Sequence, residues 1–191
     1  MLCLAYFQDA EALFDPVADL NDPGVLASFH SSLSRTREHL LGALKACLPG
    51  ASHEDLCYHF QVGTMLLMAY FDGLAVYAEK KLASPPTPGR IYWTSQSSFV
   101  DPQFRGLRAI QQRTNEYIIK GGITAHTLRN FAKHYLPWIK LADCTGGSWD
   151  IRFPLSNTEK SGPVLAGLLF PLFNDACAAY KELANLLHQE P

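Results

Sequence analysis

The stretch from Ser52 to about Leu82 constrains the fold more than any other part of the 191-residue chain. The Ser52 hydroxyl can accept hydrogen bonds from the free backbone amides of a first helical turn, and Asp55 stands where a capping box places its acidic partner. The middle of the stretch, 65–71, is apolar on every face of a helix, which is typical of a helix surrounded by neighbours. We therefore expect a central helix here, ended by the proline-rich segment 84–89.

Apolar residues three or four positions apart predict three more long helices. They cover Val25 to Leu48, Gln103 to Ile119 after the start signal Asp101–Pro102, and Pro163 to about His188, which Pro171 should bend. A shorter helix is expected from Thr124, after a diglycine, with Pro137 disturbing its end. Helices with such short connections pack into a bundle.

The remaining segments add little regular structure. Residues 1–24 form an extended N-terminal arm that we expect to pack on the domain. Residues 149–155 alternate apolar and polar side chains, as a short strand or an extended segment does. We therefore predict one all-α domain over 1–191, a bundle of four to five main helices.

Composition limits the function. The net charge of −2 gives no overall field that attracts nucleic acid, so any phosphate contact must come from a local cluster of positive charge. The five cysteines are scattered and lack CxxC spacing, which predicts reduced thiols. The N-terminus lacks the basic and apolar regions of a secretory signal, and Asp72 interrupts the most apolar run, 65–77. We expect a cytoplasmic protein without a membrane partner.

Two charged residues interrupt apolar faces. Asp72 lies in the expected central helix, where an ionised carboxylate needs a partner. Arg37 occupies an apolar position of the first helix, and Arg129 is the other candidate cation. We predict a structural polar pair of Asp72 and Arg37, with Arg129 as the alternative partner for the carboxylate.

The expected helix from Thr124 gathers the groups best suited to chemistry. His126, Asn130 and His134 are four apart and form one polar ridge, flanked by Arg129 and Lys133. Arg129 and His134 are about 140° apart around a regular helix. They converge only if the arginine curls round or a second chain supplies one of them.

The run Arg129-Asn130-Phe131-Ala132-Lys133-His134 resembles the R-polar-xxx-H signature of the HEPN-domain superfamily. Many members of that family are all-α, metal-independent ribonucleases of toxin–antitoxin and defence systems. The resemblance implies that Arg129 binds the scissile phosphate, that His134 is a general acid or base, and that Asn130 orients one of them. It also implies a homodimer with composite sites, an RNA substrate, a partner protein such as an antitoxin, and no cofactor.

The expected helix after Pro102 is the most basic of the chain. Arg105, Arg108 and Arg113 fall outside its apolar side, so they form either a solvated face or a phosphate-binding surface. We group Arg105 and Arg108 with Lys133 and His126 as candidate substrate-binding residues.

Two other classes of function stay open. In the first, the protein is a non-catalytic ligand- or protein-binding module. The polar ridge then stabilises its fold, with His134 in a buried hydrogen-bond network. A haem or aromatic-ligand pocket could use His126 or His134, which an absorbance spectrum would test. A metal site is disfavoured because His53, Cys57 and His59 lack further ligands at zinc spacing. Nucleotide-binding and hydrolase loops are absent from the sequence.

Overall fold

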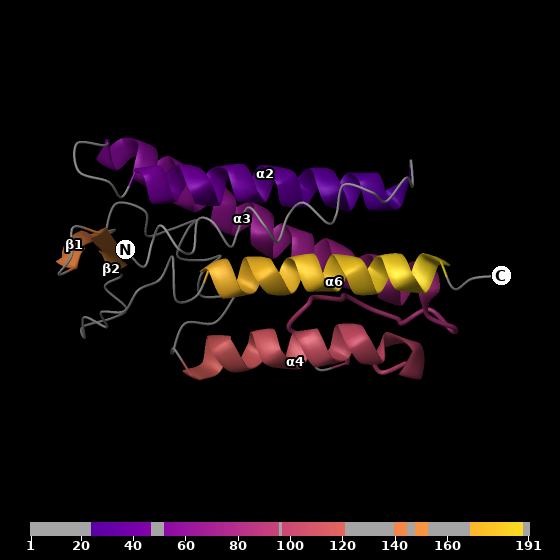
Figure 1. Ribbon diagram of the computed structural model, residues 1–191. Coiled ribbons are helices and arrows are strands. Elements are labelled where there is room, and N and C mark those ends of the chain that lie inside the picture. Colours follow the sequence, from indigo (N-terminus) through magenta and orange to yellow (C-terminus); the bar gives the residue numbers. More distant parts are fainter. Residues whose placement is uncertain are drawn as a thin grey trace.

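The computed structural model describes residues 24–46, 52–95, 97–120, 140–144, 148–152 and 169–188. Four long helices dominate this part of the chain: α2 (Val25–Lys45), α3 (His53–Tyr77), α4 (Arg105–Lys120) and α6 (Phe170–His188). They lie roughly alongside one another, with α2 and α4 running in one direction and α3 and α6 in the other (Figure 1). The prediction of an all-α helical bundle is confirmed.

Helix α2 presents one side to the core. Its buried positions fall on one side of the helix, as the helical spacing predicted: Leu26, Leu33, Thr36, Leu40, Ala43 and Leu44. The helix ends at Lys45, and 47–50 lie outside the described residues. It packs closely on α3 at Gly63, where a Cβ atom would come within 3.1 Å of the Leu40 side chain. Glycine therefore lets the two helices approach here.

Helix α3 begins as the sequence predicted. The Ser52 hydroxyl accepts from the backbone amides of Glu54 and Asp55 at 3.2 and 3.3 Å, and this satisfies two donors of the first turn. After Tyr77 the helix widens into one π-helical segment, η2 (Ala78–Leu82).

The expectation that neighbours surround the middle of α3 is wrong at two positions. Met65 is 44% exposed and Ala69 is exposed, whereas Leu67, Tyr70 and Phe71 are buried. By length and composition, His53–Leu82 could cross a membrane, yet half of its most apolar stretch is buried within the protein. The core helix of a bundle can have the same length and composition.

A strap, residues 83–101, leads from η2 to α4 by way of the short 3-10 helix η3 (Pro102–Phe104). Residues 84–86 and 88–90 are exposed, but Ile91, Trp93 and Phe99 are buried. Trp93 lies 4.7 Å from Phe71 and 5.2 Å from Phe99, measured between ring centroids. Aromatic packing thus makes the strap part of the core.

Helix α6 lies between α2 and α4 in Figure 1. Tyr70 of α3 donates to the backbone carbonyl of Ala176 at 3.2 Å, which ties α3 to α6 inside the core. The α-helical part of α6 begins at Phe170 and follows a π-helical residue, Leu169, so Pro171 lies close to the junction of the two. The expected earlier turns, from Pro163, lie outside the described residues.

Two short strands form an antiparallel pair, β1 (Lys140–Cys144) and β2 (Ser148–Arg152). Lys140 pairs with Arg152 and Cys144 with Ser148. The predicted strand is confirmed from 149 to 152, while its partner β1 was not anticipated. Residues 153–155 and the N-terminal arm as far as residue 23 lie outside the described residues.

Candidate functional site

The predicted site is only partly within the described residues. Its proposed reacting groups, Arg129, Asn130 and His134, lie outside them, as do Lys133 and His126. Arg105 and Arg108 lie on α4, and both side chains are exposed. The structure therefore locates the two predicted substrate-binding arginines on the surface of α4, and the packing of this helix fixes their position.

The start of α4 is fixed by Asp101 and Gln103. Asp101 Oδ1 accepts from the backbone amide of Gln103 at 3.1 Å, and its Oδ2 accepts from Gln103 Nε2 at 2.9 Å. These hydrogen bonds lower the pKa of Asp101 below its ordinary value. The same Nε2 donates to the backbone carbonyl of Leu82 at 3.1 Å, which joins the start of α4 to the end of η2.

Helix α4 has two distinct sides. Its buried side consists of Leu107, Ile110, Gln111 and Thr114. Arg105, Arg108 and Gln112 are exposed and share the opposite side, three and four positions apart. We call these three residues the α4 arginine face.

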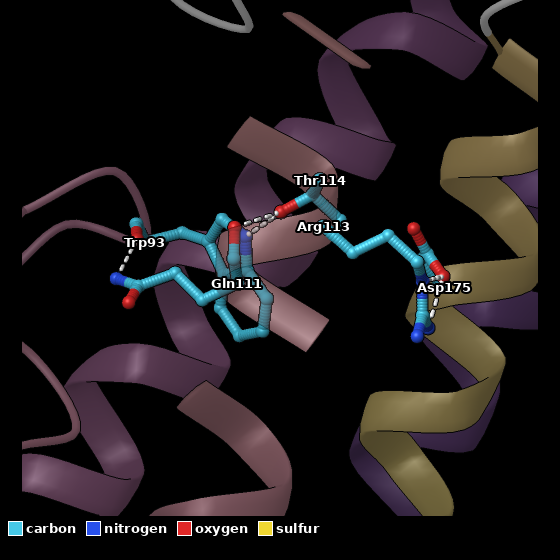
Figure 2. A network of polar contacts seen from close by, with 5 residues as sticks. All are labelled: Trp93, Gln111, Arg113, Thr114 and Asp175. Carbon is cyan, nitrogen blue, oxygen red and sulfur yellow. Dashed lines mark hydrogen bonds and ion pairs between the residues drawn. The ribbon is translucent and has the colours of Figure 1, made fainter. Parts of the chain in front are cut away.

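A hydrogen-bond network holds the buried side of α4 against the strap (Figure 2). Trp93 Nε1 donates to Thr114 Oγ1 at 2.8 Å, and this hydroxyl donates to the backbone carbonyl of Gln111 at 2.8 Å. Gln111 Nε2 in turn donates to the backbone carbonyls of Trp93 and of Ser95, the latter at 3.0 Å. Buried polar groups that are satisfied in this way fix one arrangement of the strap on α4.

Asp72 also holds the strap. Its Oδ1 accepts from the backbone amide of Trp93 at 3.0 Å, and the side chain is half-buried. The predicted requirement for a hydrogen-bonding partner is thus met by the backbone of the strap. The pairing with Arg37, which is also half-buried, stays a prediction, and Arg129 lies outside the described residues.

Glu79 is a buried carboxylate that sequence reasoning missed. It accepts from the backbone amide of Phe99 and from the hydroxyl of Thr87, so both halves of the strap converge on it. Phe99 has a left-handed backbone with φ of 60°, which is uncommon for a residue with a Cβ atom. The hydrogen bond to Glu79 stabilises this conformation.

Arg113 and Asp175 connect α4 to α6 (Figure 2). Arg113 Nε and Nη2 both donate to Asp175 Oδ1, at 2.8 and 2.5 Å. The other oxygen of Asp175 is buried and has no hydrogen-bond partner among the residues that the structure describes. The sequence placed Arg113 on the polar side of α4, but did not identify its partner.

His59 and His53, noted in the sequence, each lie close to another side chain. His39 and His59 lie Nδ1 to Nδ1 at 3.1 Å across α2 and α3, and His53 Nε2 lies 3.5 Å from Cys57 Sγ. Burial, and then the neighbouring His59, lowers the pKa of His39. In the described part of the chain, no group of three or more potential ligand side chains could hold a metal ion.

The part of the predicted site that the structure describes is an exposed surface of α4. The strap fixes α4 on one side and α6 fixes it on another, while Arg105 and Arg108 point to solvent. A guanidinium group binds phosphate through two parallel hydrogen bonds, so a pair of exposed arginines on a rigid helix can hold adjacent phosphates.

No family model matches the chain, and no curated protein or solved structure matches it.

Proposed function

We propose that the chain is a HEPN-like RNA-binding effector that cleaves RNA without a metal ion. The observation that carries the proposal is the α4 arginine face, on a helix held by Trp93 on one side and by Asp175 on another. RNA phosphates bind exposed arginines of this kind. In the proposal, this face binds the RNA backbone, and Arg129 and His134 carry out the cleavage.

The reaction requires only acid–base groups and a cation. The ribose 2′-oxygen bonds to the adjacent phosphorus while the bond to the 5′-oxygen breaks, which leaves a 2′,3′-cyclic phosphate and a 5′-hydroxyl. A base takes the 2′-hydroxyl proton and an acid protonates the 5′-oxygen. His134 suits either role because imidazoles titrate near neutral pH, and Arg129 would stabilise the added charge of the phosphorane.

Two copies of the chain complete the proposed site. Arg129 and His134 are about 140° apart on a regular helix, so one phosphate is reached most directly by Arg129 of one copy and His134 of another. Asn130 would orient the substrate or the histidine. A homodimer with two composite sites follows from the proposal.

The cleavage test uses varied RNAs in the presence of a chelator. The wild-type chain should release products ending in a 2′,3′-cyclic phosphate, whereas Arg129→Ala and His134→Ala should abolish cleavage with unchanged circular dichroism. An equimolar mixture of these two variants should regain part of the activity, because one composite site of a mixed dimer is intact. A wild-type chain that leaves every RNA intact removes the enzymatic part of the proposal.

The binding test targets the α4 arginine face. The double variant Arg105→Gln, Arg108→Gln should bind RNA more weakly and lower the slope of log K against log salt by about 1.4, at about 0.7 per lost phosphate contact. The matched control is Arg35→Gln, Arg90→Gln, which removes two exposed arginines elsewhere. If both double variants bind alike, the face has no specific role.

The alternative function is a non-catalytic protein-binding module. The exposed apolar side chains of α3, Met65 and Val76 among them, favour it because such patches mark interaction sites. A wild-type chain that neither binds nor cleaves RNA, but forms a stoichiometric complex with another protein through this helix, would support the alternative.

A further inference from the structure

The outward side of α3 is apolar over about 27 Å of helix. Tyr58, Met65 and Val76 are 56%, 44% and 42% exposed, and Ala69 and Gly73 are exposed between them. These positions recur three, four or seven apart, so they share one side of the helix, opposite its buried residues. We call these five residues the α3 outer face.

No charged side chain occupies the α3 outer face. Between Tyr58 and Val76 the sequence has one carboxylate, Asp72, and its Oδ1 accepts from the backbone of Trp93. Helices α2 and α6 lie on another side of α3 (Figure 1), where Gly63 packs against Leu40 of α2 and Tyr70 donates to Ala176 of α6. Among the described elements, α2 reaches the edge of the outer face, where His39 lies 5.6 Å from Tyr58 between ring centroids and Phe29 lies near Gly73. The five residues are nevertheless exposed, and exposed apolar patches of this kind mark interfaces.

The ends of the outer face carry opposite charges. Glu54 and Asp55 lie in the first turn of α3, whereas Lys80 and Lys81 lie in η2 just beyond Val76. Glu54, Asp55 and Lys81 are exposed, and within the described residues no ion pair engages them. A helix with an acidic start, an apolar middle and a basic end is complementary to an antiparallel copy of itself.

We propose that the α3 outer face binds the α3 outer face of a second copy, antiparallel and related by a two-fold axis. With the axis near the level of residue 67, the acidic start of each helix lies against the basic end of the other. A parallel pair would instead place acid against acid and lysine against lysine. The charges therefore select the antiparallel arrangement, in which like charges are kept apart.

Side-chain sizes agree with this register. Met65 of one copy lies opposite Ala69 of the other, and Tyr58 lies opposite Val76. Each large side chain thus faces a smaller one. An isologous interface must be self-complementary in this way. The pairing depends on α3 and η2 and holds whether or not the chain cleaves RNA.

The first test measures the mass in solution by analytical ultracentrifugation across a dilution series. The wild-type chain should be a dimer, and Ala69→Glu should be a monomer because it buries two charges at the centre of the interface. Ala109→Glu is the matched control, since Ala109 is an exposed alanine of α4, and it should stay dimeric. A monomeric wild-type chain overturns the proposal, as does an Ala69→Glu variant that remains dimeric.

The second test reverses charges at the two ends, far from the core. Asp55→Lys and Lys81→Glu should each raise the dimer dissociation constant by about fivefold at low salt, because each places like charges together at both ends of the interface. The double variant should restore the wild-type value. Circular dichroism checks that each variant is folded. A double variant that is weaker than both single variants contradicts the antiparallel pairing.

Discussion

Arg113 and Asp175 join α4 to α6 with unequal burial: the arginine side chain is 47% exposed, whereas the carboxylate is 8% exposed. Two donor nitrogens of the arginine, Nε and Nη2, contact the same oxygen, Oδ1. Water can therefore replace Asp175 around Arg113, but it cannot readily replace Arg113 around Asp175. The contact consequently stabilises the carboxylate more than the arginine.

This inequality predicts unequal losses on mutation. Arg113→Ala should lower the free energy of unfolding by about 3 kcal/mol, because it leaves a buried charge without a partner. Asp175→Asn should cost about 1 kcal/mol, since Arg113 can be solvated and the amide oxygen can still accept. Urea unfolding measures both values, with Arg108→Ala as an exposed control within about 0.5 kcal/mol of wild type. Equal losses for Arg113→Ala and Arg108→Ala would contradict the assignment.

Two buried threonines should respond in opposite directions to replacement by valine. Thr114→Val removes the acceptor of Trp93 Nε1 and should destabilise the protein by about 1–3 kcal/mol. The hydroxyl of Thr64 is buried without a hydrogen-bond partner among the described residues, so Thr64→Val should stabilise by about 1 kcal/mol. Thermal unfolding followed by circular dichroism compares the two variants. Destabilisation by both would show that the hydroxyl of Thr64 has an unrecognised partner.

Sequence reasoning succeeded where the signal is local. The start of α3 at Ser52 and of α4 after Asp101 follow from capping chemistry within a few residues. The buried positions of α2 follow from helical spacing. The outer face of α3 was missed because apolar side chains alone do not distinguish a core position such as Leu67 from an exposed one such as Met65.

Contacts between distant segments could not be read from spacing. Arg113 and Asp175 are 62 positions apart, and Trp93 reaches Thr114 from the strap. One signal was available, however, because Asp175 interrupts an apolar run, as Asp72 does, and a buried carboxylate calls for a partner. In the candidate site, Arg105 and Arg108 are exposed, as their positions outside the apolar side of the helix predicted. Arg129 and His134 lie outside the described residues.

Acid should destabilise the protein through His39. Its pKa is lowered from 6.5 by burial and then by His59, while Glu38 opposes the shift. The unfolded chain therefore takes up a proton on His39 at a higher pH than the folded chain does. The stability present at about pH 7 should thus fall as the pH drops below about 6.5. His39→Gln should flatten the fall in melting temperature between about pH 7 and pH 5. His188→Gln, at the exposed end of α6, should leave the fall unchanged.

Alkali should destabilise the protein through two groups at the junction of α3 and α6. Burial raises the pKa of the Cys177 thiol from 9.0 to about 12, and burial also raises the pKa of Tyr70 well above 10.0. Above about pH 9 the unfolded chain loses the Cys177 proton while the folded chain keeps it. Stability should then fall by about 1.4 kcal/mol per pH unit for this group.

Thiol chemistry and unfolding together check the alkaline prediction. In the folded protein at about pH 8, an alkylating reagent should modify the half-buried Cys57 and spare Cys177, whereas both should react in urea. Cys177→Ala should reduce the alkaline slope of the unfolding free energy, even if it lowers stability at neutral pH by leaving a small cavity. The cavity lowers the unfolding free energy equally at every pH, whereas the thiol proton changes its slope with pH. An unchanged slope in Cys177→Ala would therefore show that the thiol ionises in the folded protein.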